Sequence, residues 1–162
     1  MDATIRRPSG SSRDLLIAAG FVVASNALGA LPSLRFGADT TWFERPWFFP
    51  PDVAFPVVWT LLFTLLGIAA YLVWRRGTER RAVRVALGAF AVQFALNLAW
   101  TPAFFGLRRP GLGLIVIGLL WLAIVATVVA FDRVDRRAAA LLVPYLAWVS
   151  FAAVLNYAIY AG

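Results

Sequence analysis

Five long stretches without a charged residue constrain this chain more than any other feature of its sequence. Each stretch holds 20 or more residues, and a helix of roughly 20 apolar residues can cross the hydrocarbon core of a membrane. Of the 162 residues, 62% are hydrophobic and 14% are charged, so little chain remains for a soluble domain. We therefore predict an all-α, polytopic membrane protein, a single five-transmembrane-helix bundle over residues 1–162, with spans at about 15–34, 53–74, 85–107, 111–131 and 138–161.

The basic residues are all arginines, and they divide unequally between the two ends of the predicted spans. An excess of basic residues marks the cytoplasmic side of a membrane protein. We therefore expect a cytoplasmic (inner) membrane protein with its N-terminus in the cytoplasm and its first loop and C-terminus outside. This placement accounts for the net charge of +7 without nucleic acid as a partner. Four arginines lie at one end, and eleven lie at the other: Arg6, Arg7, Arg13, Arg75, Arg76, Arg80, Arg81, Arg84, Arg133, Arg136 and Arg137.

Several residue types that common membrane chemistry requires are missing, because the sequence has no Lys, His or Cys. Without Lys there is no Schiff base to a retinal, and without His or Cys the ordinary ligand sets for zinc and haem iron are excluded. No charged residue lies inside a predicted span, whereas ion-coupled carriers usually place ionisable groups there. The sequence therefore favours non-covalent binding by aromatic and neutral polar groups, with no cofactor and no metal.

Neutral polar residues form a stripe along the third predicted span. Gln93, Asn97 and Thr101 are spaced four residues apart and so share one face of a helix, with Trp100 beside them. Such amides either contact a ligand or join helices by interhelical hydrogen bonds. For Gln93 both interpretations stay open, while Asn97 lies in the outer half of the membrane beside an indole and is a candidate ligand contact.

Tryptophans on the second and fifth predicted spans lie deeper than residues of an interfacial belt. Trp59 lies roughly 9 Å below the start of its span, and Phe63 follows one turn later on the same face. We interpret these residues as the lining of a pocket in the outer half of the bundle. On the fifth span Pro144 is expected to kink the helix, and residues on one face there are Tyr145, Trp148, Ala152 and Asn156.

The connector at residues 35–52, between the first two predicted spans, is unusually rich in aromatic residues and proline. Within it, residues 42–52 contain two Trp, three Phe and three Pro. Exposed to water, so many large apolar side chains would be unfavourable. We interpret this segment as a lid, an ordered loop that covers the outer end of the bundle, and we expect Asp52 to cap the helix that follows.

Four short motifs occur in order along the chain, each on its predicted helix or loop. They are Trp42-Phe43 with Arg45-Pro46-Trp47 and Pro50-Pro51; Val58-Trp59-Thr60; Asn97-Leu98-Ala99-Trp100-Thr101-Pro102 with Phe104-Phe105-Gly106; and Val143-Pro144-Tyr145-Leu146-Ala147-Trp148, with the tail Val154-Leu155-Asn156-Tyr157 after them. From the first span onward the chain resembles the TspO/MBR family of tryptophan-rich sensory proteins and translocator proteins (peripheral benzodiazepine receptors).

The resemblance implies a five-helix bundle, commonly a homodimer, with a pocket between its helices that the first loop closes. It implies porphyrins such as protoporphyrin IX as ligands, besides sterol-like or lipid molecules and synthetic drugs. The family often has Tyr where this chain has Phe43, so one hydroxyl contact to the ligand is missing. The ligand-binding residues that the motifs carry over are Trp42, Pro46, Trp47, Trp59, Phe63, Asn97, Trp100, Tyr145, Trp148 and Ala152.

Three functions are compatible with these residues. The leading hypothesis is a membrane receptor or sensor that binds a tetrapyrrole in the aromatic pocket. The second is an enzyme that degrades porphyrin with light and oxygen, as the resemblance suggests, in which Trp59 and Trp148 would take part. The third is passive translocation of porphyrin or lipid. We favour the first, because the sequence offers no acid, base or metal for a catalytic step inside the membrane.

Overall fold

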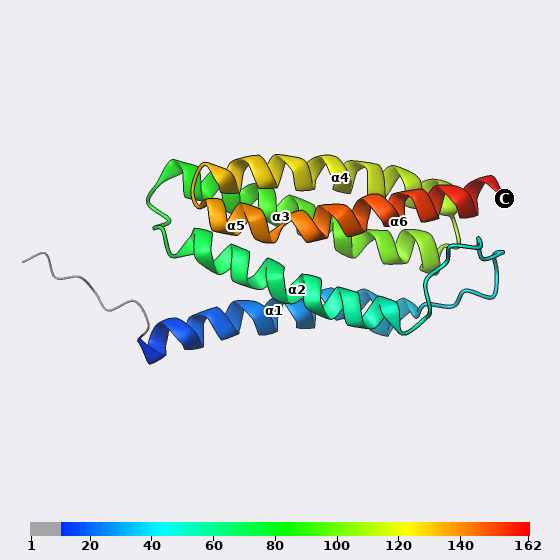
Figure 1. The fold of residues 1–162 in the computed structure, drawn as a ribbon, viewed down its shortest axis with the longest axis horizontal. Helices are drawn as coiled ribbons and strands as arrows, with labels where there is room; N and C mark the ends of the chain where they lie inside the picture. Colours follow the sequence, from blue (N-terminus) through cyan, green and yellow to red (C-terminus); the bar gives the residue numbers. More distant parts are fainter. Residues whose placement is uncertain (1–10) are drawn as a thin grey trace, which may run out of the picture.

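The computed structural model describes residues 11–162, which form long helices joined by loops (Figure 1). Five helical segments are long and apolar enough to cross a membrane, which confirms the predicted all-α bundle and makes this a multi-pass membrane protein. Arg6 and Arg7 lie outside the described residues. The helices are α1 (Ser12–Phe36), α2 (Ala54–Trp74), α3 (Arg81–Thr101) with the π-helical turn η1 (Pro102–Gly106), α4 (Pro110–Asp132), α5 (Arg136–Leu141) and α6 (Val143–Ala161).

Several helices begin before the apolar stretch that predicted them. The predicted third span starts at residue 85, whereas α3 starts at Arg81 and includes Arg84. The first helix likewise includes Arg13 and Asp14. Charged residues can continue a helix beyond the hydrocarbon core, because the backbone hydrogen bonds do not depend on the side chain and the charge reaches water. The apolar stretch thus marks the membrane core, not the helix ends.

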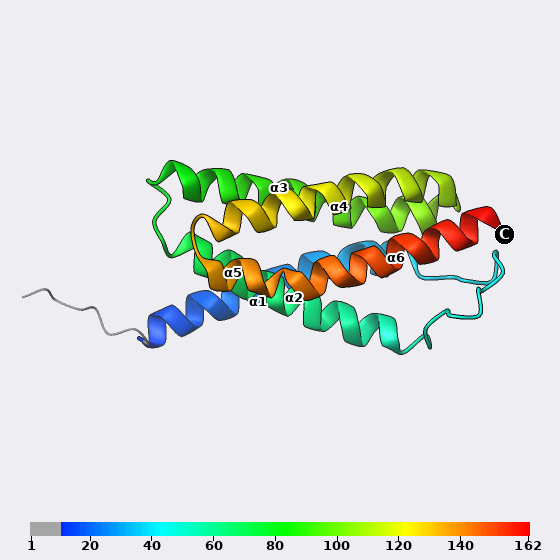
Figure 2. The same cartoon turned by 45° about the horizontal axis from the view of Figure 1, so that its top comes forward.

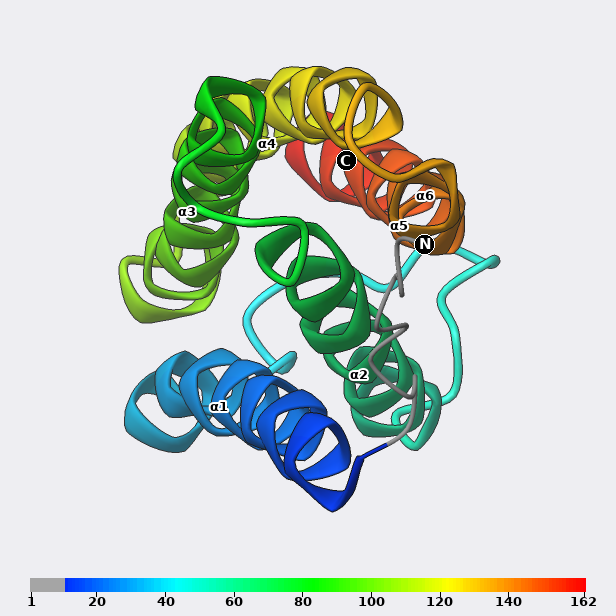
Figure 3. The same cartoon turned by 90° about the vertical axis from the view of Figure 1, so that its left-hand side faces the viewer.

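The helices surround a common core in an order that differs from their order in the chain. Viewed along the bundle, α1 contacts α2 and α3, α4 packs between α3 and α6, and α2 packs against α5 (Figure 3). The ribbons of α2 and α6 diverge toward the end of the bundle that carries the first loop and the C-terminus (Figures 1 and 2). We call this the loop end; the opposite end is the arginine-rich end.

Two prolines coincide with departures from α-helical geometry. After Pro102 the chain forms one π-helical turn, in which the N–H of Leu107 donates to the Pro102 carbonyl at 2.8 Å. Near Pro144 the last span is interrupted at Leu142, where α5 ends and α6 begins. Proline has no N–H for the carbonyl four residues earlier, so the interruption precedes the proline. In place of the expected kink at Pro144, the structure has an interruption of the helix two residues upstream.

Two glycines bring α1 and α2 into close contact. A methyl group added at Gly67 of α2 would lie 2.7 Å from Cα of Val22 and 2.8 Å from the carbonyl oxygen of Phe21. A methyl group at Gly29 of α1 would overlap the ring of Phe63. The side-chain amide of Asn26 also donates to Thr64 Oγ1 at 3.1 Å, so polar and steric contacts fix the same interface.

We expect Gly67→Ala to destabilise the protein, because the new methyl group meets backbone atoms that cannot rotate away. Overpacking of this kind costs about 1–3 kcal/mol, which for a chain of this length corresponds to a melting temperature lower by about 2 °C or more. The matched control is Gly20→Ala, where nothing lies within 4 Å of the added methyl group. Thermal unfolding in detergent measures both; equal melting temperatures for the two variants would contradict the close contact.

At the arginine-rich end, an ion pair joins the α2–α3 connection to the α4–α5 connection. Arg76 Nε donates to Asp135 Oδ2 at 3.0 Å, and the Asp135 carboxylate also accepts the N–H of Arg137 at 2.9 Å. Burial raises the pKa of Asp135, but the hydrogen bonds from Arg76 and Arg137 and the charge of Arg76 outweigh it and hold the pKa below its ordinary value. Because the folded-state pKa is lowered, the pair stabilises the fold at neutral pH and loses this effect as the pH falls through that pKa.

Asp135→Asn should lower the melting temperature at pH 7, since a hydrogen bond to a charged group contributes about 2 kcal/mol. The difference from the unmodified protein should shrink as the pH falls below about 4, the ordinary pKa of an aspartate in the unfolded chain, and then through the lower pKa of folded Asp135. Thermal unfolding from pH 3 to pH 8 measures the difference. A difference that is constant over this range would show that the charge of Asp135 does not contribute.

Candidate ligand-binding site at the loop end

The first loop is held in place by charged contacts at both of its ends. Gly37 ends α1 with a φ of 70°, and Asp39 then accepts the N–H of Thr41 at 2.9 Å. The Asp39 carboxylate also pairs with Arg108, at 3.2 Å, in the connection between η1 and α4. Hydrogen bonds from the Thr41 hydroxyl and N–H, together with the Arg108 charge, lower the pKa of Asp39. Because its pKa is lowered, the Asp39 carboxylate stays ionised at a pH where an ordinary aspartate is already protonated. The ion pair with Arg108 therefore keeps the loop attached to the η1–α4 connection over this range.

Arg45 and Asp52 close the second half of the loop. Their side chains form an ion pair at 3.1 Å, and the Arg45 guanidinium carbon lies 4.9 Å from the centre of the Phe49 ring. The expectation that Asp52 caps α2 is wrong, because its carboxylate is turned to Arg45. The N-cap of α2 is Val53, which makes no side-chain hydrogen bond.

The aromatic side chains of the loop pack onto the bundle. Trp42 and Phe43 both contact the buried ring of Phe104 in η1, with ring centres 5.4 Å and 5.8 Å away. Trp100 stacks on the same Phe104 ring at 5.1 Å. Within the loop, Phe43 also contacts Phe49 at 6.0 Å. Through Phe104, the aromatic residues of the loop are thus joined to the end of α3.

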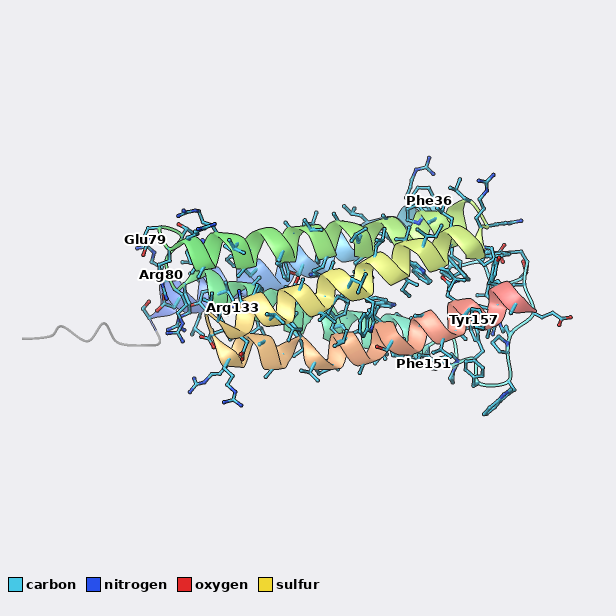
Figure 4. All side chains as sticks on the ribbon, turned by 90° about the horizontal axis from the view of Figure 1, so that it is seen from above. Phe36, Glu79, Arg80, Arg133, Phe151 and Tyr157 are labelled. Atoms are coloured by element: carbon cyan, nitrogen blue, oxygen red, sulfur yellow. The ribbon has the colours of Figure 1, made fainter. Side chains whose placement is uncertain are left out.

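A second row of rings fills the space where α2 and α6 diverge. Phe55 of α2 contacts Trp148 of α6 edge to face at 6.1 Å, and Trp148 contacts Phe151 at 5.4 Å. From the loop, Phe48 reaches Phe151 at 6.4 Å and Phe49 reaches Phe55 at 5.5 Å. Figure 4 places Phe151 on the loop-end side of the bundle. Aromatic contacts, not packed backbones, therefore connect α2 to α6 here.

A third group of rings lies deeper, on α2 and α6. Trp59 stacks on Phe63 with ring centres 5.3 Å apart and meets Tyr145 edge to face at 6.5 Å. On its other side the Phe63 ring lies against Gly29 of α1, where any side chain would overlap it. The wall formed by Trp59 and Phe63 is thus supported from behind by α1.

A buried chain of hydrogen bonds joins α3 to α6 beside these rings. The Asn97 amide donates to the Tyr145 hydroxyl at 2.9 Å, and that hydroxyl donates to Gln93 Oε1 at 2.8 Å. Nearer the loop, Trp100 Nε1 donates to Asn156 Oδ1 at 3.1 Å, and Asn156 donates to the carbonyl of Pro110 at 2.8 Å. The side-chain amides of Gln93 and Asn97 therefore join α3 to α6 by hydrogen bonds, which is the interhelical interpretation left open for Gln93.

Two buried donors, one in the first loop and one on α3, have no acceptor among residues 11–162. They are the indole Nε1 of Trp42 and the amide Nε2 of Gln93. An unpartnered buried polar group is costly, and native proteins leave few of them. The Gln93 side chain thus joins helices through its oxygen, while its nitrogen is left without an acceptor.

The structure brings most of the sequence-predicted site residues together. Trp59, Phe63, Asn97 and Tyr145 are linked by direct contacts, while Trp42 and Trp100 meet on the Phe104 ring and Trp148 contacts Phe55. Ala152 packs half-buried against the core. Pro46 is half-buried and its carbonyl accepts the N–H of Phe49 at 2.9 Å.

Trp47 is the member of the predicted set that stays apart from the others. Its side chain is 96% exposed and contacts only the ring of Phe48 among the aromatic residues described. Its role as a ligand contact remains a prediction. Conversely, the sequence interpretation missed Phe55 and Phe151, although their spacing of four from Trp59 and three from Trp148 places them on the same helix faces.

These features define a class: a multi-pass helical membrane protein whose aromatic interior is covered by its first loop. Residues 18–161 match the model of the TspO/MBR family, and the chain belongs to that family. It is 48% identical over 119 residues to the tryptophan-rich protein TspO of Chlorobaculum tepidum (74% of this chain, 75% of that one). It is 40% identical over 150 residues to the human translocator protein (88% of each chain). It is 39% identical over 119 residues to the tryptophan-rich sensory protein of Cereibacter sphaeroides (72% and 73%).

Tyr145→Phe should destabilise the bundle, because it leaves the Asn97 amide and the Gln93 carbonyl oxygen buried without their shared partner. Two interhelical hydrogen bonds are worth about 1–3 kcal/mol together, so the melting temperature should fall by several degrees. Tyr157→Phe is the control, since that side chain is exposed and forms no hydrogen bond with another described residue. A melting temperature for Tyr145→Phe equal to that of the control would show that the hydrogen-bond chain carries no stability.

Proposed function

We propose that this protein is an integral membrane receptor or sensor for a tetrapyrrole such as protoporphyrin IX, held at the loop end between α2, α3 and α6. The observation that carries the proposal is the pair of buried donors, Trp42 Nε1 and Gln93 Nε2, beside stacked aromatic rings. A flat, conjugated molecule gains stacking energy on indole and phenyl faces. Its few polar groups would then supply the acceptors that these two donors lack.

Access to such a site requires the rings between α2 and α6 to separate, because Phe55 and Trp148 are in contact. The ion pairs of the loop oppose this separation only weakly. The Arg45–Asp52 and Arg108–Asp39 pairs are largely exposed, and exposed ion pairs contribute about 0–1 kcal/mol each. Loop opening followed by insertion of the ligand between the rings is therefore the proposed binding route.

The arrangement in the membrane is part of the proposal. Of the arginines described, four lie at the loop end and nine at the arginine-rich end, namely Arg13, Arg75, Arg76, Arg80, Arg81, Arg84, Arg133, Arg136 and Arg137. This asymmetry supports a cytoplasmic arginine-rich end and an outer loop end in the cytoplasmic membrane. We propose a homodimer on the resemblance alone.

The test is a titration of the purified protein with protoporphyrin IX, followed by tryptophan quenching in the dark. We expect saturable binding that is weakened about thirtyfold in the double variant Trp59→Phe/Trp148→Phe, since each indole face contributes roughly 1 kcal/mol of stacking. Trp74→Phe is the matched control, because Trp74 packs on Phe21 and Tyr71 of α1 and α2 at the arginine-rich end. Absence of saturable binding in the dark would overturn the proposal.

The same titration under illumination separates a receptor from an enzyme. Trp59 and Trp148 lie within the proposed site, where light-excited porphyrin and oxygen could react beside them. A receptor leaves the porphyrin absorbance unchanged in light, apart from the bleaching seen without protein. Light-dependent loss of absorbance that disappears in the double variant and persists in Trp74→Phe would establish porphyrin degradation instead.

A further inference from the structure

A concave surface lies at the arginine-rich end, away from the proposed tetrapyrrole site. It is an open groove of about 370 Å³ between the last turns of α4 and the start of α5 and α6. Figure 4 places Arg133 at this end, together with Glu79 and Arg80 and opposite Tyr157. The groove is lined by Val128, Val129, Asp132, Arg133, Arg136, Ala139, Ala140 and Val143.

The lining divides into a charged rim and an apolar floor. The rim carries Arg133 and Arg136, which follow and begin the helices on either side of the α4–α5 connection. The floor exposes Val129 and Val143, of which 48% and 55% are accessible. From Arg136 to Val143 the groove extends over seven residues, about 10 Å at the rise of a helix. It therefore begins at the membrane surface and continues into the hydrocarbon region.

The two rim arginines are free to bind an anion. Neither forms an ion pair with another residue in the range 11–162, whereas Arg76 is paired with Asp135 nearby. Asp132 also lines the groove and opposes an anion with one charge, so the lining keeps an excess of one positive charge. Arg137 lies next to the rim and adds to this field.

We propose that this groove binds an anionic phospholipid, with the phosphate at Arg133 and Arg136 and the upper part of one acyl chain along Val129, Ala140 and Val143. A basic rim above an apolar floor complements such a lipid in both charge and polarity. A soluble anion would use the rim alone, and a zwitterionic lipid would bring a positive group against the arginines. The site is independent of the porphyrin site and does not depend on the proposed function.

The test measures lipid binding to the detergent-purified full chain by native mass spectrometry, with dioleoyl phosphatidylglycerol and dioleoyl phosphatidylcholine in competition. We expect preference for phosphatidylglycerol. In Arg133→Gln/Arg136→Gln this preference should fall by roughly thirtyfold, from the attraction expected of two interfacial arginines. The matched control is Arg80→Gln/Arg81→Gln, which removes the same charge at the same end but outside the groove, and should retain most of the preference.

Two further variants separate a built site from general attraction to a basic surface. Ala140→Leu fills the floor without changing charge and should weaken binding several-fold, whereas Asp132→Asn removes the opposing charge and should strengthen it. Equal loss in the groove and control double variants, or no effect of Ala140→Leu, would overturn the proposal in favour of surface attraction. Binding of glycerol phosphate as strong as that of the lipid in the same measurement would assign the rim to a soluble phosphate instead. Melting temperatures close to that of the unmodified protein show that the groove variants are folded.

Discussion

Hydrocarbon cannot accept or donate hydrogen bonds, and every polar group within the spans of this protein is placed under that constraint. The consequence is visible in the contacts between α3 and α6, where the Tyr145 hydroxyl joins the Asn97 amide to the Gln93 side-chain oxygen and the Trp100 indole donates to Asn156. These bonds join two helices at the level where aromatic rings, not backbone packing, fill the interior. The polar groups therefore determine where α3 and α6 meet, and the rings occupy the space that remains toward α2.

Irregular backbone occurs at the two positions where it serves this arrangement. The π-helical turn after Pro102 carries Phe104, on which Trp42 and Trp100 both pack. The interruption at Leu142 separates α5, which packs on α2, from α6, which diverges from it. The π-helical turn thus carries the ring on which the loop packs. The interruption at Leu142 precedes the part of α6 that diverges from α2, where aromatic side chains fill the space between the two helices. At the arginine-rich end, by contrast, the Arg76–Asp135 ion pair joins the α2–α3 connection to the α4–α5 connection.

The sequence carried enough information for the number of spans and for the helix faces that meet inside the bundle. Hydrophobic length fixes the first, and the spacing of Asn97, Tyr145 and Trp148 fixes the second, because the hydrocarbon leaves polar residues few alternatives. The partner of Asp52 was not predictable, since a loop carboxylate can cap a helix or pair with an arginine that local spacing does not identify. The exposure of Trp47 likewise depends on the path of the loop. The groove at the arginine-rich end depends on the relative placement of α4 and α5, which the spacing of residues along the chain does not predict.

The contact between Gly29 and Phe63 makes α1 the rear support of the site, although α1 contributes no residue to the predicted ligand set. Phe63 is held between Gly29 on one side and Trp59 on the other, with Phe94 against its edge. Close-packed interiors transmit displacement instead of absorbing it. A sideways shift of α1 within the bilayer would consequently move the Phe63 ring and change the tilt of the Trp59 indole. The helix that faces lipid over most of its length is in this way mechanically connected to the aromatic interior.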